Sequence, residues 1–437
     1  MTTVPDSLPL PPRVDADSPA HTRRGPERPF DAVILASFGG PEAQEEVLPF
    51  LRRVTAGRGI PDERLEDVAV HYRTLGGVSP INAQNRRLVA ELEAELGRRG
   101  IDLPVRLGNR NSEPFLAGTV QTLADEGKRH LLGLATSAYS SYSGCRQYRE
   151  DFALALEETG LAGAVTIDRI RAYFDAPGFL EPTVDGIRDA IADLVVAGHD
   201  TDRIRILFST HSIPHAMAEA SGPAETRAAG SGGWYLAQHD AACRWVWDRL
   251  DDELPHVPDW QLVYQSRSGA PHVPWLEPDI NDVIEEIART ESADAVIVVP
   301  IGFISDHMEV VWDLDHEARD TAAAHDLSFR RVATPAEDQR FVRSLADLIQ
   351  ERLEPQRPRA ELTDFGPLPD VCGPACCAGR MIRPTVGAVD SAADVEKWRA
   401  ACAATACDAA RPASTDAPES SRPDSQRPDS QRQEVQR

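Results

Sequence analysis

Hydrophobic and polar positions along the chain fall into blocks that predict strands followed by amphipathic helices. The first block is an aliphatic run at 31–37, a Phe38-Gly39-Gly40-Pro41 loop and an amphipathic stretch at 42–54. The same order then recurs, with strands expected at 105–108, 130–135 and 164–170 and helices at 113–126, 145–159 and 178–197. Strands that alternate with helices predict a parallel sheet covered by helices on both faces.

A second series of the same kind begins at residue 203. Its strands are expected at 203–210, 261–265 and 295–300, and its helices at 234–254, 279–290, 308–324 and 335–353. The predicted fold class is therefore α/β, with two doubly wound, Rossmann-like domains and a cleft between them. We place the N-terminal domain at 30–198 and the C-terminal domain at 199–355.

Three segments lie outside the two series. Residues 1–29 are rich in proline and lack the apolar core of a signal peptide, which predicts a disordered arm. A cysteine-bearing extension is expected at 356–408. The tail at 409–437 repeats Arg-Pro-Asp-Ser-Gln, and its polar composition predicts disorder.

Charge and hydropathy exclude several partners. The 437 residues carry a formal net charge of -24, and a nucleic-acid-binding protein needs a basic face. No apolar run approaches the roughly 18 residues that span a bilayer, so no stable membrane insertion is expected. We expect a cytoplasmic protein that is a monomer.

His211 is the first candidate for chemistry. It follows the apolar run 204–208 and precedes Pro214, so it is expected at the carboxyl end of a strand. Ligands bind at that edge of open α/β sheets, where an imidazole can act as a base or a metal ligand near neutral pH. The alternative is a structural histidine that satisfies loop backbone.

Three carboxylates follow a second strand end. Glu309, Asp313 and Glu317 are spaced by four, so a helix places them on one face. Like charges at this spacing repel unless a cation or a proton offsets them, which indicates a path for a metal ion or for protons. The alternative for the outer two, Asp313 and Glu317, is a solvated acidic face.

Several separated motifs, taken together, resemble the ferrochelatase family over residues 30 to 354. They are Gly39-Gly40-Pro41, the segment 71–80, Ser209-Thr210-His211-Ser212, Gln265-Ser266-Arg267 and Asp306-His307-Met308-Glu309-Val310. The resemblance implies two lobes that enclose a porphyrin and an enzyme, a lyase, that inserts Fe2+ as its substrate. It assigns His211 and Glu309 as the catalytic metal-binding and proton-handling pair. The spacing of the carboxylates adds Asp313 and Glu317 as a candidate relay.

The same resemblance assigns four porphyrin-binding residues. It places Phe38 and Ser79 along the porphyrin cleft, and Arg58 and Tyr148 near the macrocycle or its carboxylates. Some relatives carry a tyrosine at the position of Phe38 that ligates iron, and a phenylalanine cannot do this. An axial ligand from this position is therefore excluded.

The substrate and the activity have alternatives. The cysteine-bearing extension and the Ala-, Arg- and Asp-rich composition resemble ferrochelatases that use coproporphyrin III. Protoporphyrin IX shares the same metal chemistry and stays open. Cobalt or nickel chelatases of corrin pathways and a non-catalytic tetrapyrrole carrier are further alternatives, although a carrier needs affinity without a base.

The cysteines indicate a second metal centre. Cys372, Cys376 and Cys377 lie within six residues and Cys145 lies far upstream; four thiolates suit an iron-sulfur cluster or, alternatively, zinc. Some ferrochelatases resemble this chain in holding a 2Fe-2S cluster with three extension cysteines and an internal one. Cys243 is expected to pack inside a helix, and we do not expect the two cysteines near the tail, Cys402 and Cys407, to be ligands.

Overall fold

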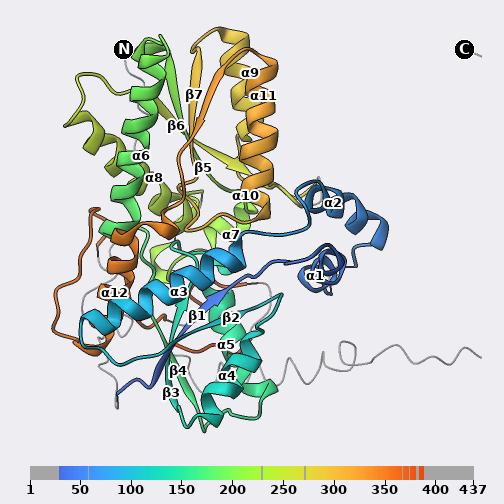
Figure 1. The fold of residues 1–437 in the computed structure, drawn as a ribbon, viewed down its shortest axis with the longest axis vertical. Helices are drawn as coiled ribbons and strands as arrows, with labels where there is room; N and C mark the ends of the chain where they lie inside the picture. The colour runs from blue at the N-terminus through green and yellow to red at the C-terminus, as the bar shows by residue number, and fades with distance from the viewer. Residues whose placement is uncertain are drawn as a thin grey trace, which may run out of the picture.

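The computed structural model describes residues 29–57, 59–227, 230–269, 272–366, 368–373, 375–379 and 383–387. This part of the chain contains two four-stranded parallel sheets with the orders β2-β1-β3-β4 and β6-β5-β7-β8. The strands of the first sheet are β1 (Ala32–Ser37), β2 (Val105–Asn109), β3 (His130–Ala135) and β4 (Thr166–Arg169). Those of the second are β5 (Ile204–His211), β6 (Asp259–Gln265), β7 (Ala295–Val299) and β8 (Ser328–Arg331). The predicted pair of doubly wound domains is confirmed, and the sheets form the two lobes seen in Figure 1.

The central strands are apolar because helices cover both faces of each sheet. Strand β1 is buried along its whole length and pairs in parallel with β2 and β3, with Val33 opposite Val105 and Leu132. Strand β5 pairs with β6 and β7, with Phe208 opposite Leu262 and Val299. The edge strand β8 was not predicted, because its half-buried Ser-Phe-Arg-Arg sequence has no apolar run.

Helices account for most of the remaining described chain. Those of the first half are α1 (Val47–Val54), α2 (Asp62–Thr74), α3 (Ile81–Arg98), α4 (Leu116–Asp125), α5 (Gln147–Glu158) and α6 (Pro177–Val196). Those of the second half are α7 (His215–Glu219), α8 (Gly233–Asp251), α9 (Ile280–Thr290), α10 (Met308–Trp312), α11 (Arg319–Ala324) and α12 (Gln339–Leu353). The sequence pattern did not predict α2 or α3. A π turn precedes α5 at Tyr142–Arg146, and another joins α10 to α11 at Asp313–Ala318.

The last helix of each series crosses to the other lobe. Helix α6 packs against α8, β7 and β8 of the second lobe, whereas α12 returns to pack on α3 of the first. Figure 1 shows α12 and α3 together in the lower lobe and α6 in the upper lobe. A division at residue 198 therefore separates the two sheets in sequence but not the helices that cover them. One hydrophobic core runs through both lobes as a result.

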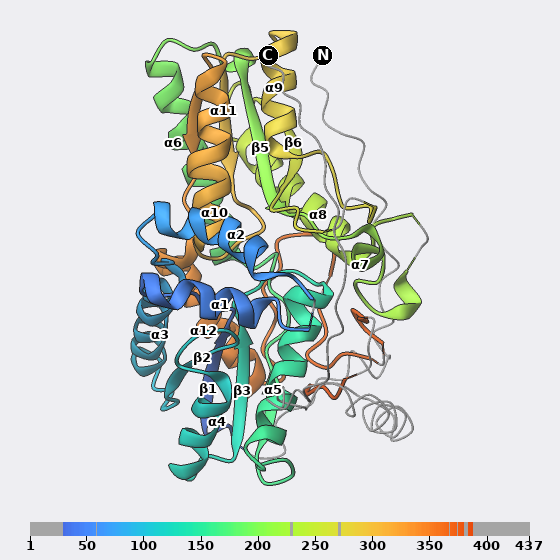
Figure 2. The ribbon, with the colours of Figure 1, turned by 90° about the vertical axis from the view of Figure 1, so that its right-hand side faces the viewer.

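The segment after α12 folds back over both lobes. The Phe365 ring lies 5.3 Å from that of Phe174 in the first lobe and 5.2 Å from that of Trp234 in the second, both edge-on. Arg352 Nη1 of α12 forms an ion pair with Asp370 Oδ2 at 3.3 Å. The cysteine-bearing segment that follows is thus held at the junction of the lobes, as Figure 2 shows.

Some expectations lie outside the described residues. They concern the arm up to residue 28, Arg58, Cys402, Cys407 and the tail. Among the described helices, none combines the length and the apolar character needed to cross a lipid bilayer.

Candidate active site and cysteine centre

The topology of each sheet places a switch point beside its first strand. The chain leaves β5 towards β6 on one side and returns to β7 on the other, and β1 has β2 and β3 in the same arrangement. Ligands of open α/β sheets bind at the carboxyl ends of strands beside such a point. His211 is the last residue of β5, and Glu309 follows β7 in the first turn of α10. Both predicted catalytic residues therefore lie at the switch point of the second sheet.

His211 and Glu309 face each other. His211 Nε2 lies 3.6 Å from Glu309 Oε2, and His211 Nδ1 lies 2.5 Å from the carbonyl oxygen of Ser212. Because a carbonyl only accepts, Nδ1 carries a hydrogen and donates it, which leaves Nε2 as the atom that binds a proton or a metal. The side chains of His211 and Glu309 are 34% and 52% exposed, so both are open to a substrate.

The two groups favour each other's charged forms. Burial opposes ionisation of Glu309, but the hydrogen bond and charge of His211 and the charge of His307 lower the pKa of Glu309 to about 2. Burial likewise opposes the charge on His211, yet Glu309, the Ser212 carbonyl and Asp313 raise its pKa above the ordinary value. Glu309 is therefore a carboxylate at neutral pH, beside an imidazole that readily takes a proton.

Asp313 has the opposite character. Burial and the negative charges of Glu309 and Glu317 raise the pKa of Asp313 to about 7, against the hydrogen bond from the Ser266 hydroxyl and the charge of His211. Gln265 Nε2 also donates to Asp313 Oδ2 at 3.2 Å. Ser266 adopts a φ of +61°, a left-handed conformation that is uncommon outside glycine. Asp313 can therefore exchange a proton near neutral pH.

The predicted single α-helix at 308–324 is interrupted. The π turn at Asp313–Ala318 inserts between α10 and α11, a feature frequent at functional sites. Glu317 lies within this turn, where its carboxylate accepts a hydrogen bond from Trp312 Nε1 at 2.7 Å. Of the three carboxylates, Glu309 is thus paired with a histidine, Asp313 with a serine and Glu317 with a tryptophan.

The loop after β1 forms the facing wall of the first lobe. Phe38 is 36% exposed, and its ring meets that of Phe50 edge-on at 6.0 Å. Gly39 has a φ of +78°, and a Cβ atom there would lie 2.4 Å from Ser112 Oγ. Only glycine fits this conformation and this contact, so Gly39 fixes the path of the loop that presents Phe38.

The other predicted porphyrin-binding residues are less accessible. Ser79 is buried, and its backbone N–H donates to the Pro41 carbonyl at 2.9 Å. Tyr148 is buried in the helical layer of the first lobe, where burial raises its pKa. Both residues therefore support the wall from behind in this conformation.

Sequence reasoning missed Arg110, which connects two of these residues. Its guanidinium carbon lies 5.7 Å from the centre of the Phe38 ring and 4.7 Å from that of Tyr148. Arg110 Nε donates to Asp151 at 2.6 Å, and its buried Nη2 has no hydrogen-bond partner within the described part of the chain. A cation-π contact to Phe38 places a basic group next to the exposed ring. No strand or helix pattern marks an arginine in a loop for this role.

A buried network behind His211 was also missed. Tyr235 donates its hydroxyl hydrogen to the His211 carbonyl at 2.8 Å, and Thr210 Oγ1 lies 2.8 Å from His239 Nε2. Burial lowers the pKa of His239 to about 3, so this imidazole is neutral. It stacks on Tyr139 of the first lobe with ring centroids 3.7 Å apart. The network fixes the end of β5 and joins the lobes behind it.

Known proteins match this chain over most of its length. The family profile described as Ferrochelatase matches residues 30–353. The chain belongs to the ferrochelatase family. It is 53% identical over 357 residues to the coproporphyrin III ferrochelatase of Leifsonia xyli, which covers 80% of this chain and 91% of that protein. The protein of the same name from Streptomyces griseus is 48% identical over 373 residues, covering 83% of this chain and 97% of the relative.

A solved structure of SirB from Bacillus subtilis aligns with 75% of this ferrochelatase-family chain and 96% of its own, at 11% identity and a TM-score of 0.42. The family assignment rests on the sequence matches. They extend from the first strand to the end of α12 and so include both the His211–Glu309 pair and the Phe38 loop.

The four cysteines predicted as a centre come together in this ferrochelatase-family member. Cys145 lies in the π turn before α5, and it packs with Cys372, Cys376 and Cys377 in one buried cluster. The Sγ atoms of Cys376 and Cys377 are 4.0 Å apart. Two thiolates on one tetrahedral metal are separated by about 3.8 Å, so this spacing is close to that of ligands. Cys243 is buried in α8, as expected.

The case for a metal rests on this packing and on the buried charges beside it. In the described part of the chain, no three histidine, cysteine, aspartate or glutamate side chains are placed as ligands of a single ion. Hydrogen bonds from Cys372 and Cys377, together with Arg169 and Arg149, lower the pKa of Cys145 despite its burial. Arg169 Nη1 donates to Cys145 Sγ at 3.0 Å. The neighbouring thiols and burial raise the pKa values of Cys372, Cys376 and Cys377 instead. Cys145 is therefore the thiol of the cluster that ionises most readily, and soft metal centres require thiolates.

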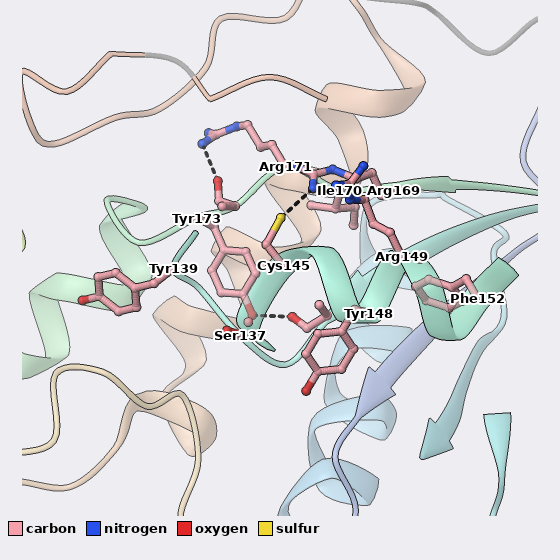
Figure 3. Close-up of a pocket in the computed structure, with 14 residues that line it drawn as sticks. Ser137, Tyr139, Cys145, Tyr148, Arg149, Phe152, Arg169, Ile170, Arg171 and Tyr173 are labelled. Atoms are coloured by element: carbon pink, nitrogen blue, oxygen red, sulfur yellow. Dashed lines mark hydrogen bonds between the residues drawn. The ribbon is translucent and has the colours of Figure 1, made fainter. Parts of the chain in front are cut away.

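A small pocket adjoins Cys145 (Figure 3). Its lining includes Arg149, Arg169 and the rings of Tyr148 and Tyr173. Tyr148, predicted from the resemblance as a porphyrin contact, thus also borders the cysteine centre. Helix α5, which carries Tyr148, directly follows the π turn that holds Cys145.

Proposed function

We propose that this chain is a coproporphyrin III ferrochelatase that inserts Fe2+ into the macrocycle as a step of heme biosynthesis. The observation that carries the proposal is the pair formed by His211 Nε2 and Glu309 Oε2, 3.6 Å apart and open to substrate. Metallation must remove two pyrrole protons while a divalent ion enters. A carboxylate beside an imidazole supplies both a base and ligands that Fe2+ accepts.

The proton path follows from the pKa values of the carboxylates. Glu309, with a pKa of about 2, is ionised. Its negative charge attracts Fe2+ and favours the protonated form of His211. Asp313, with a pKa of about 7, can accept a proton and release it at neutral pH. Pyrrole protons that reach the His211–Glu309 pair therefore leave through Asp313, and Glu317 at the far side of the π turn leads towards solvent. Two protons depart as one divalent ion enters, so charge is conserved.

The porphyrin seat combines an exposed ring with basic groups. Phe38 offers its face to the macrocycle and supplies no axial ligand. The guanidinium of Arg110 lies beside the Phe38 ring and brings a positive charge towards the carboxylates of the macrocycle edge. The proposed porphyrin seat is completed by Arg58, Ser79 and Tyr148. Ser79 and Tyr148 contribute by shaping the wall behind Phe38.

Coproporphyrin III is preferred to protoporphyrin IX for two reasons. The relatives named above are coproporphyrin III ferrochelatases and cover at least 80% of this chain. Coproporphyrin also carries more edge carboxylates, which gives basic residues such as Arg110 more partners. We place this reaction in the cytoplasm with the protein as a monomer.

We further propose that Cys145, Cys372, Cys376 and Cys377 hold a 2Fe-2S cluster. The support is the burial of all four thiols in one cluster and the buried guanidinium groups next to them. Such a cluster, when bound, cross-links its four thiolates and accepts one electron. Zinc is the rival occupant because four thiolates also suit its tetrahedral preference.

The test is anaerobic metallation followed by absorbance. Purified protein is mixed with Fe2+ and either coproporphyrin III or protoporphyrin IX, alongside the His211→Ala variant. We expect faster metallation of coproporphyrin III and its loss in the variant. A higher kcat/KM with protoporphyrin IX would change the substrate, and metallation of neither would contradict the enzyme assignment.

A further inference from the structure

Two buried guanidinium groups lie beside the four thiols without a carboxylate partner. Arg149 is 2% exposed and Arg169 is 7% exposed. Across the described residues, neither forms an ion pair with an aspartate or a glutamate. A buried charge is costly unless an opposite charge pairs with it. Within the described part of the chain, these two charges therefore need a partner other than a carboxylate.

Neighbouring arginines of the same region follow the usual rule. Arg146, also buried, donates through Nε to Glu150 at 2.9 Å. Arg171 is paired with Glu351 at 2.8 Å. Arg146 also donates through Nη1 to the Cys376 carbonyl at 3.3 Å, but Glu150 already balances its charge. Arg149 and Arg169 border the cysteines without such a carboxylate among the described residues.

The contacts of Arg149 and Arg169 identify what they face. Arg169 Nη1 donates to Cys145 Sγ at 3.0 Å, while its other two nitrogens donate to the carbonyls of Pro369 and Asp370. Arg149 Nη2 donates to the Cys376 carbonyl at 3.3 Å, and its Nε and Nη1 have no hydrogen-bond partner among the residues that the structure describes. Figure 3 shows both guanidinium groups beside Cys145. Unpaired buried N–H groups need an acceptor.

Negative charge on the cysteines would satisfy both arginines. Burial alone lowers the pKa of Arg169, but negative charge on Cys372 and Cys145 more than offsets it, so its pKa is raised. An oxidised two-iron, two-sulfide core held by four thiolates carries two net negative charges, which matches two guanidinium charges. Its sulfur atoms are also acceptors for N–H groups.

We propose that Arg149 and Arg169 are the counter-ions of a doubly negative centre held by Cys145, Cys372, Cys376 and Cys377, and that the unpaired N–H groups of Arg149 donate to its sulfur atoms. This inference rests on the iron-sulfur cluster of the proposed function. One-electron reduction adds a third negative charge, which the two guanidinium groups stabilise. Removing either arginine therefore makes reduction harder.

The test compares midpoint potentials of the full-length protein during anaerobic titration with dithionite, followed by absorbance and by electron paramagnetic resonance. The variants are Arg149→Gln and Arg169→Gln, with Arg149→Lys as the variant that keeps the charge. The matched control is the double variant Arg171→Gln/Glu351→Gln, which removes an equally buried guanidinium together with the carboxylate that it pairs with at 2.8 Å. Iron, acid-labile sulfide and zinc are measured for every protein.

We expect each Gln variant to lower the equilibrium constant for reduction at least tenfold, about 59 mV for one electron. Arg149→Lys and the double variant should stay within about threefold of the wild type. A wild-type potential in both Gln variants, with iron and sulfide bound, would overturn the counter-ion assignment alone. Zinc in place of iron and sulfide would overturn the iron-sulfur proposal. If the Gln variants then retained as much zinc as the wild type, the assignment of Arg149 and Arg169 as counter-ions would be overturned as well. A protein without metal would overturn both.

If the Gln variants fail to accumulate as folded protein, Arg149→Lys decides the matter. It keeps the charge but loses the planar fork of N–H groups. An unchanged potential with altered resonance g values supports the assignment, and an unchanged resonance spectrum contradicts the N–H donation to sulfur.

Discussion

Charge is balanced differently at the His211–Glu309 pair and at the four-cysteine centre. Glu309 and His211 balance each other, and both side chains stay open to solvent at 52% and 34% exposure. The cysteines are buried, with Cys377 at 0% exposure, and two unmatched guanidinium groups accompany them. A site that must exchange its substrates keeps a balanced, solvated pair. A site built for a resident group carries that group's counter-charge in the protein.

The two regions share one structural device. Asp313 and Cys145 each lie in a π turn, at Asp313–Ala318 and Tyr142–Arg146. A π turn adds a residue to a helical turn and shifts the side chains that follow, at some cost in helix stability. In both regions it occurs where a functional side chain leaves a regular helix.

The largest expected effect separates the members of the carboxylate row. Glu309→Gln removes the base next to His211 and should lower kcat/KM for iron insertion about 10²- to 10⁴-fold, the usual range for a lost general base. Glu317→Gln is the matched comparison, because Glu317 lies at the outer end of the proposed proton path, where water can replace it, and its carboxylate is engaged with Trp312 Nε1. Its effect should stay below about threefold. Equal losses in the two variants, measured by anaerobic absorbance, would contradict the distinct roles.

The second-largest effect is expected at the cysteine centre. Cys377→Ser should abolish bound iron and sulfide and lower the free energy of unfolding by at least about 3 kcal/mol, because a bound centre contributes to folding. Cys243→Ser is the control, since Cys243 is equally buried but lies in apolar surroundings of α8. It should keep the iron and lose only about 1 to 2 kcal/mol. Metal analysis and thermal unfolding check both results, and iron retention in Cys377→Ser would contradict the assignment.

A smaller effect is expected in the Phe38 loop. Gly39→Ala would force a φ of +78° on alanine and bring its Cβ within 2.4 Å of Ser112 Oγ. We expect a loss of about 2 to 3 kcal/mol in unfolding free energy and a higher KM for porphyrin. Gly118→Ala serves as the control, because a Cβ at this position in α4 meets nothing within 4 Å. Denaturant unfolding that finds the two variants equal would exclude a special role for Gly39.

The smallest effect concerns pH. The pKa of Asp313 is raised to about 7 in the folded chain from an ordinary 3.8, so its contribution to stability is complete below about pH 4 and is lost as the pH rises through 7. Asp313→Asn removes this dependence. Relative to wild type, the variant should gain up to about 2 kcal/mol between pH 5 and pH 8.

The same substitution should remove an inflection near pH 7 from the profile of kcat/KM. Denaturant unfolding at the two pH values and steady-state assays check both parts. A constant stability difference across this range would show that Asp313 is already ionised at pH 5.

The strands were the most predictable part of the fold. In β1 and in the first part of β5 both faces are covered, so most positions are apolar and the run is visible in the sequence. Helix α2 was missed because its Asp-Glu-Arg-Leu-Glu-Asp sequence gives a weak periodicity, and only three of its residues are buried. The π turns were missed because no residue pattern distinguishes them from an α-helix.

The residues of the two candidate sites also differ in how far the local sequence predicts them. His211 and Glu309 could be predicted because they end a strand and begin a helix, positions that the local sequence defines. The roles of Arg149 and Arg110 could not, because they depend on contacts with distant parts of the chain. Arg149 meets Cys376 across 227 residues, and Arg110 meets Phe38 from another loop.

The most direct test of the account separates porphyrin binding from metallation. Coproporphyrin III is bound first to the wild type and to His211→Ala under anaerobic conditions, and Fe2+ is then added in a single turnover. The account predicts that Kd for the porphyrin changes less than about threefold, because Phe38 and Arg110 form the seat, while the metallation rate falls at least 100-fold. A variant that loses porphyrin binding but metallates bound porphyrin at the wild-type rate would contradict it.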